Sequence, residues 1–219
     1  MKTRPNQQRT HKAGHIKKQA VSALADRLPT LSSCRAQTKL NMAKVAFVAT
    51  GHKTSVTDAC EDSGRLNADT FFDNLRSMTH TNALMCLTQT NDALLRLARE
   101  EGVLPAECAI AIDQHVDPDY SKKHEGCIGY PKLPGTDYGM SYISTESITP
   151  PARFTFAFTP VRAGTDQEKI LDEQLEETLK WTRVSLALLD RGFARTYVYL
   201  ALLKHGIRFV VPLPENERV

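Results

Sequence analysis

The sequence has no apolar run that approaches the roughly 20 residues needed to span a bilayer, and its N-terminus is polar where a secretory signal would be apolar. Its five cysteines stand singly, without a C-x-x-C pair, which argues against a zinc site and a disulfide framework. With 219 residues, 41% of them hydrophobic, the chain can bury one core and carry a small accessory domain. These absences predict a cytoplasmic protein with reduced thiols and no membrane partner.

Acidic residues are almost missing from the first quarter of the chain. Residues 1–53 hold eleven Lys and Arg against one acid, Asp26, a formal charge of +10, whereas the rest holds 17 basic and 24 acidic residues. Neutralising phosphates releases counterions and gives affinity for any nucleic-acid sequence, so this asymmetry favours a nucleic-acid contact. A solubilising tail is the alternative interpretation.

Residues 1–18 and 19–104 form the first two of three predicted regions. The first is a basic arm, expected to be disordered, whose candidate DNA contacts are Lys12, Lys17 and Lys18. The second reads as helical, and its two short helices around Gly64 resemble a helix-turn-helix. Arg76 is the one basic residue on the presumed reading helix, so a plain helical hairpin is the competing interpretation.

The third region, 105–219, mixes strands and helices. Residues 108–112 form an apolar run typical of a strand covered on both faces. Further elements are expected at 141–149 and 152–161 (a hairpin), 166–182 (a helix), 184–189 (a strand), 195–204 (a helix) and 207–211 (a strand). The order β, β, β, α, β, α, β predicts a mixed sheet with packed helices, in the α+β or α/β class.

Two aspartates follow two of these strands. Asp113 closes the run 108–112, and Asp190 follows the strand 184–189. Carboxylates at the C-terminal ends of strands face the crevice where α/β sheets place their chemistry, and two of them can share a divalent cation. The pair suggests metal-assisted phosphoryl transfer. Taken singly, either residue could instead cap a helix or form a turn.

The third region combines A-I-A-I-D at 109–113, a following loop rich in Gly, Lys and Tyr, a hairpin, and L-L-D-R-G-F at 188–193. In these features the sequence resembles the DDE transposases of prokaryotic insertion sequences, particularly those with a D-x-G-F second motif. The resemblance implies a ribonuclease-H-like catalytic core in which Asp113 and Asp190 hold Mg²⁺ or Mn²⁺. It implies that the partner is double-stranded DNA, both the transposon ends and the target. It also allows the protein to form a homo-oligomer. Lys122, Lys123 and Arg191 are candidate phosphate contacts of such a core.

The family's third carboxylate, a Glu within Y-x-x-R-x-x-x-E, has no match here: Leu200 and Leu202 follow Tyr197 and Tyr199 three residues on. Glu215 and Glu217 lie in an expected turn and are not proposed as catalysts. The chain is therefore expected to be an N-terminal part of such an enzyme, with a C-terminally incomplete core that binds metal weakly. The alternatives are a non-catalytic DNA-binding remnant and a stand-alone nuclease.

Overall fold

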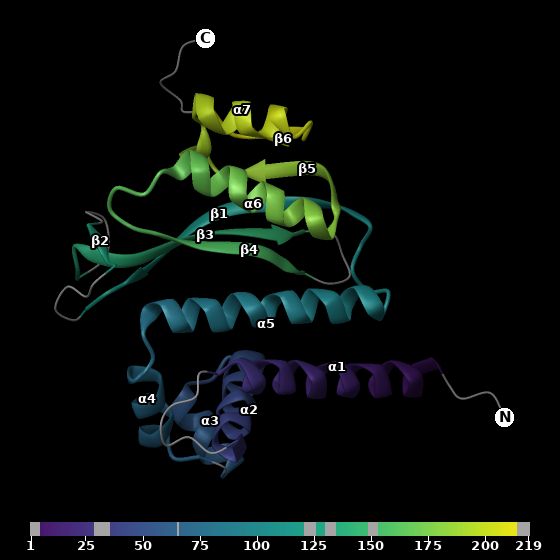
Figure 1. Ribbon diagram of the computed structural model, residues 1–219, viewed down its shortest axis with the longest axis vertical. Helices are drawn as coiled ribbons and strands as arrows, with labels where there is room; N and C mark the ends of the chain where they lie inside the picture. The colour runs from purple at the N-terminus through teal and green to yellow at the C-terminus, as the bar shows by residue number, and fades with distance from the viewer. Residues whose placement is uncertain are drawn as a thin grey trace. The chain divides into compact units, whose positions relative to one another are not determined.

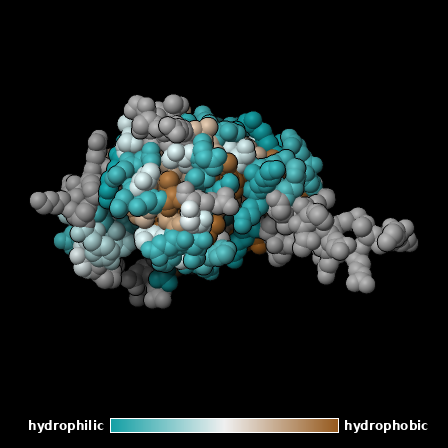
Figure 2. Space-filling view, turned by 90° about the horizontal axis from the view of Figure 1, so that it is seen from below, coloured by the Kyte–Doolittle hydropathy of each residue, from teal (hydrophilic) through white to brown (hydrophobic). Residues whose placement is uncertain are grey.

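The structure is a computed structural model that describes residues 5–28, 36–64, 66–120, 126–129, 135–148 and 153–213 (Figure 1). The chain divides into two compact units, Met1–Ala98 and Arg99–Val219. No described helix combines the length and the apolar character that a membrane span requires. Figure 2 views the molecule from below Figure 1 and shows a mostly hydrophilic surface, in which hydrophobic residues gather in one small area.

The first unit is built from helices. They are α1 (Pro5–Arg27), α2 (Ala36–His52), α3 (Val56–Ser63), α4 (Ala68–Arg76) and α5 (His80–Glu100), the last of which continues into the second unit. The Ser55 hydroxyl accepts a hydrogen bond from the Asp58 amide at 3.0 Å and caps α3, and Gly64 ends that helix with φ 56°. Asn67 caps α4 in the same way. The helix starts that the sequence predicts therefore depend on local side-chain caps.

The structure gives a helix for the described part of the segment that was expected to be a disordered arm, residues 1–18. Pro5–Arg27 forms one helix, with proline in the first helical position that it favours. Gln, Lys and Ala, ten of the 23 residues of this helix, are good helix formers. The helix is also held from its other end, because Val21 and Ala25 are buried in one cluster with Ala43 of α2. Residues 1–4 lie outside the described part of the chain.

The second unit is a six-stranded mixed sheet with packed helices, as the sequence predicts. Its elements are β1 (Glu107–Pro118), β2 (Ile128–Gly129), β3 (Tyr138–Ser147), β4 (Thr155–Val161), α6 (Gln167–Trp181), β5 (Arg183–Leu189), the 3-10 turn η1 (Arg191–Phe193), α7 (Thr196–Lys204) and β6 (Phe209–Val210). β3 lies antiparallel between β1 and β4, whereas β5 runs parallel to β1 and β6 parallel to β5. This mixed α/β order is consistent with a ribonuclease-H-like fold.

Helix α6 lies across one face of the sheet (Figure 1). Its fully buried Gln174 donates from Nε2 to the Ile143 carbonyl and accepts from the Thr145 hydroxyl, each at 2.7 Å. Leu171 and Leu175 of the same helix are buried beside it. The polar bridge identifies the face of β3 that carries Thr145 as the face under α6.

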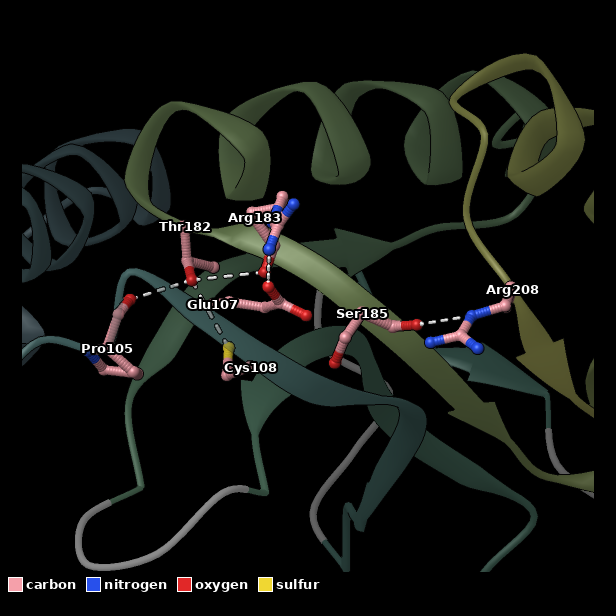
Figure 3. A network of polar contacts seen from close by, with 7 residues as sticks. All are labelled: Pro105, Glu107, Cys108, Thr182, Arg183, Ser185 and Arg208. Atoms are coloured by element: carbon pink, nitrogen blue, oxygen red, sulfur yellow. Dashed lines mark hydrogen bonds and ion pairs between the residues drawn. The ribbon is translucent and has the colours of Figure 1, made fainter.

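The starts of β1 and β5 are joined by polar contacts (Figure 3). The Thr182 hydroxyl donates to the Pro105 carbonyl at 2.9 Å, and Arg183 pairs with Glu107. The backbone amide of Arg183 also donates to the Ala106 carbonyl. These contacts set where the parallel β1–β5 ladder begins. The register then shifts by one residue between Cys108, opposite Val184, and Ala109, opposite Leu186.

Candidate functional site

Asp113 and Asp190 follow the last paired residues of two neighbouring parallel strands. The ladder between β1 and β5 ends with Ile112 opposite Leu189, and each aspartate is the next residue of its strand. Neighbouring strands lie about 4.8 Å apart, so the register brings the two positions together at one place on the sheet. Alternation along β1 puts Asp113 on the face opposite the buried Ile112. Asp190 follows β5 and is exposed.

The expectation that Asp113 closes its strand is wrong. β1 continues to Pro118, because β3 goes on pairing with it after β5 has ended, with Asp113 opposite Ser144. Asp113 therefore lies inside a strand but at the point where its parallel neighbour stops. A local apolar pattern cannot show this, since the continuation depends on a partner that is distant in the sequence.

Asp190 does end its strand. Its backbone is extended, and its Oδ1 accepts a hydrogen bond from the Gly192 amide at 2.9 Å, which caps η1. A Cβ atom on Gly192 would lie 3.1 Å from that same oxygen, so glycine lets the chain turn closely around the carboxylate. Phe193 is buried. The capping role and a metal-binding role are compatible, because the cap uses one carboxylate oxygen.

Asp113 lies on the face of the sheet opposite α6. Directly opposed residues of antiparallel strands share a face, and Thr145, which contacts α6, stands opposite Ile112. Asp113 and His115 therefore point the other way, and the His115 ring stacks on Tyr142 with centroids 5.0 Å apart. The Asp113 side chain is 50% exposed, and its Oδ2 lies 3.6 Å from Nε2 of His115. Solvent can thus reach this carboxylate.

Glu146 is a residue on this face that sequence reasoning did not single out. It lies on β3, two positions from the Ser144 that opposes Asp113, and its Oε1 lies 3.5 Å from the Ser144 hydroxyl. Burial raises the pKa of Tyr142 on the same strand, and the charges of Asp117, Glu146 and Asp113 raise that pKa further. Three carboxylates thus act on one tyrosine hydroxyl. The polar residues 142, 144 and 146 alternate along the sequence, which indicates that they share one face of a strand. Only the register of β3 against β1 shows that this face is the one that carries Asp113.

The predicted DNA-contacting residues are spread over several elements. Lys17 and Lys18 are exposed on α1, and Arg191 is exposed in η1. Arg76 is exposed on α4 and forms an ion pair with Asp73 at 3.2 Å, which offsets its charge locally. Of Lys12 only the helical backbone is described, and Lys122, Lys123, Glu215 and Glu217 lie outside the described residues.

A second group of possible metal ligands lies elsewhere in this unit. Among the residues that the structure describes, one group of three or more His, Cys, Asp or Glu has all its ligand atoms within 4.8 Å of one another, and it consists of Asp172, Glu176 and His205. Asp113 and Asp190 are not members of it. No local pattern in the sequence indicates this group, because His205 follows α7 and the two carboxylates come from α6.

No protein-family model matches the chain, and no curated protein matches it in sequence. Among solved structures, the chain is similar to a piggyBac transposase in a synaptic complex with hairpin DNA, determined by cryo-EM. The TM-score is 0.46 and the sequence identity 14%, over 93% of this chain and 49% of that chain. The chain therefore spans about half the length of that transposase.

Proposed function

We infer that the second unit is a DDE-transposase core that holds a divalent cation at Asp113 and Asp190 and acts on double-stranded DNA. The observation that carries this proposal is the register of β1 and β5, which places the two motif aspartates directly after the paired residues Ile112 and Leu189. The proposal is also supported by the position of the D-R-G-F motif, which directly follows β5 in the expected order of strands and helices. The strand order alone, or the motif alone, would also fit a purely structural role.

The donor set fits Mg²⁺ or Mn²⁺. Both ions prefer carboxylate oxygens, and Mg²⁺ keeps several waters, which suits a pair of aspartates with solvent access. Asp113 is half-exposed, and the amide of Gly192 holds the carboxylate of Asp190 in place. Asp113 and Asp190 would hold the ion, which would supply electrostatic stabilisation for phosphoryl transfer. The two aspartates would orient it, and Glu146 adds a third carboxylate to the same face.

The proposed DNA contact rests on charge. Residues 1–53 carry a formal charge of +10, and Lys17 and Lys18 are exposed on α1. Phosphate contacts of this kind give affinity for duplex DNA without sequence preference. The insertion-sequence origin and the D-x-G-F subgroup remain part of the proposal and rest on the motif alone.

A non-catalytic DNA-binding protein is the second candidate. One observation favours it: these 219 residues contain no Y-x-x-R-x-x-x-E motif to supply the family's third carboxylate. Two carboxylates can bind a cation, but the second cation of a two-metal mechanism then lacks a dedicated ligand unless Glu146 provides it.

Nicking of supercoiled plasmid DNA separates the two candidates, because it needs no knowledge of the transposon ends. The wild-type chain would be incubated with plasmid in Mn²⁺, beside Asp113→Asn, Asp190→Asn and Glu146→Gln. Asp117→Asn is the matched control, since Asp117 lies on the same strand four residues further on. If the wild type and the Asp117→Asn control nick the plasmid and the other three variants do not, the result supports the transposase core, with Glu146 as its third carboxylate. If the wild type and the variants bind DNA but none of them nicks it, the result favours the non-catalytic protein.

A further inference from the structure

Helix α6 and the end of α7 bring an imidazole and two carboxylates together, away from Asp113 and Asp190. Asp172 and Glu176 lie one turn apart on α6, and His205 is the residue directly after α7. Residues four apart on a helix present their side chains on the same face. The ligand atoms of all three residues lie within 4.8 Å of one another.

Asp172 is the centre of this group. Its Oδ1 lies 2.7 Å from His205 Nε2, and its Oδ2 accepts from the Lys204 ammonium, also at 2.7 Å. The hydrogen bonds from Lys204 and from His205 lower the pKa of Asp172. The His205 side chain is only 13% exposed, so its imidazole is held beside Asp172. One imidazole nitrogen and one carboxylate oxygen are thus held next to each other by a hydrogen bond.

Charged groups of both signs surround Asp172. An open cavity of about 490 Å³ reaches it and is lined by the carboxylates of Asp166, Glu168 and Asp172 and by the ammonium groups of Lys169 and Lys204. The carbonyl end of α7, where His205 follows, carries the negative end of the helix dipole, which favours a cation there. The cavity gives water access to Asp172.

We propose that Asp172, Glu176 and His205 bind one divalent transition-metal ion, of which Zn²⁺ is the representative. Zn²⁺ accepts imidazole and carboxylate ligands at about 2.0–2.2 Å, and three protein ligands leave a fourth position for water. Binding requires the side chains to close around the ion and the Lys204 ammonium, 2.7 Å from Asp172 Oδ2, to leave that carboxylate. The bound ion clamps the end of α7 to α6. This site is separate from the proposed transposase centre and does not depend on it.

The test is calorimetric titration of Zn²⁺ into the full chain after treatment with EDTA. All proteins carry Asp113→Asn, so that the other proposed metal site does not contribute. Glu176→Gln, an exposed position whose change leaves the fold intact, should weaken binding at least tenfold, and so should His205→Ala. Glu173→Gln is the matched control, because Glu173 lies on the same helix but pairs with Lys169. It should bind Zn²⁺ like the parent.

Lys204→Gln supplies an independent readout. Lys204 competes with the metal for Asp172, so its removal should strengthen Zn²⁺ binding several-fold. Zn²⁺ should also raise the melting temperature of the parent but not that of Glu176→Gln. Equal weakening by Glu176→Gln and Glu173→Gln would mean diffuse surface binding and overturn the proposal. Unchanged affinity in Lys204→Gln would show that Asp172 is not a ligand and overturn it as well.

Discussion

Replacing Asp113 with Asn should have opposite effects on stability with and without Mg²⁺. Without metal, Asp113 and Asp190 follow paired residues on adjacent strands and repel each other. The substitution removes one of the two charges and keeps the shape of the side chain. It should therefore stabilise the metal-free protein while removing the response to metal, and a purely structural aspartate would do neither.

The spacing of neighbouring strands sets the size of the repulsion. Two unit charges about 5 Å apart repel by about 0.8 kcal/mol in water and by about 3 kcal/mol at an effective dielectric constant of 20. The Asp113 side chain is 50% exposed, so solvent screening keeps the value near the lower figure. We expect Asp113→Asn to raise the free energy of unfolding by about 1 kcal/mol without metal.

Metal binding acts in the other direction. If the wild-type site binds Mg²⁺ with a Kd on the order of 1 mM, then 10 mM Mg²⁺ stabilises it by about 1.4 kcal/mol, an increase that Asp113→Asn loses. Urea denaturation with 10 mM MgCl₂ and with EDTA measures both effects, and Asp117→Asn should keep the response to Mg²⁺. A variant that is less stable than wild type in EDTA and is still stabilised by Mg²⁺ would refute the site.

The order of strands and helices could be predicted because it depends on local patterns. The period-two alternation at 154–158 predicts β4, and the apolar stripe of 166–182 predicts α6, which the structure confirms as Thr155–Val161 and Gln167–Trp181. The caps of α3 and α4 are local in the same sense, because Ser55 and Asn67 accept hydrogen bonds from amides two or three residues further on. Such signals act within a few residues of the chain, so they are readable without a partner.

Pairing between distant segments could not be predicted. The apolar run ends at Asp113, yet β1 continues because β3 supplies partners as far as Gly139 opposite Pro118. The same register brings Glu146 to the face of Asp113. The pair of Asp172 and His205 also depends on packing, because it joins α6 to the residue after α7. Residues placed by such pairing stay invisible until the fold is known.

Three further predictions test the sheet, its open face and the DNA contact. Gln174→Leu leaves the Thr145 hydroxyl and a backbone carbonyl without their buried partner, so it should lower the free energy of unfolding by about 1–3 kcal/mol in urea denaturation, and Thr145→Val should recover part of this loss in the double variant. Tyr142 should titrate in NMR above the ordinary range of a tyrosine hydroxyl, and neutralising any of the three carboxylates that raise its pKa should lower that pKa; an unchanged value would separate those carboxylates from the tyrosine. Lys17→Gln with Lys18→Gln should weaken binding to duplex DNA, because both lysines are exposed on α1 within the most basic part of the chain. Each lost phosphate contact lowers the slope of log K against log salt by about 0.9 for B-DNA, so the double variant should lose up to about 1.8 in slope. A slope equal to that of wild type in titrations from low to physiological salt would leave these lysines as a solvated face of the helix and place any DNA contact elsewhere.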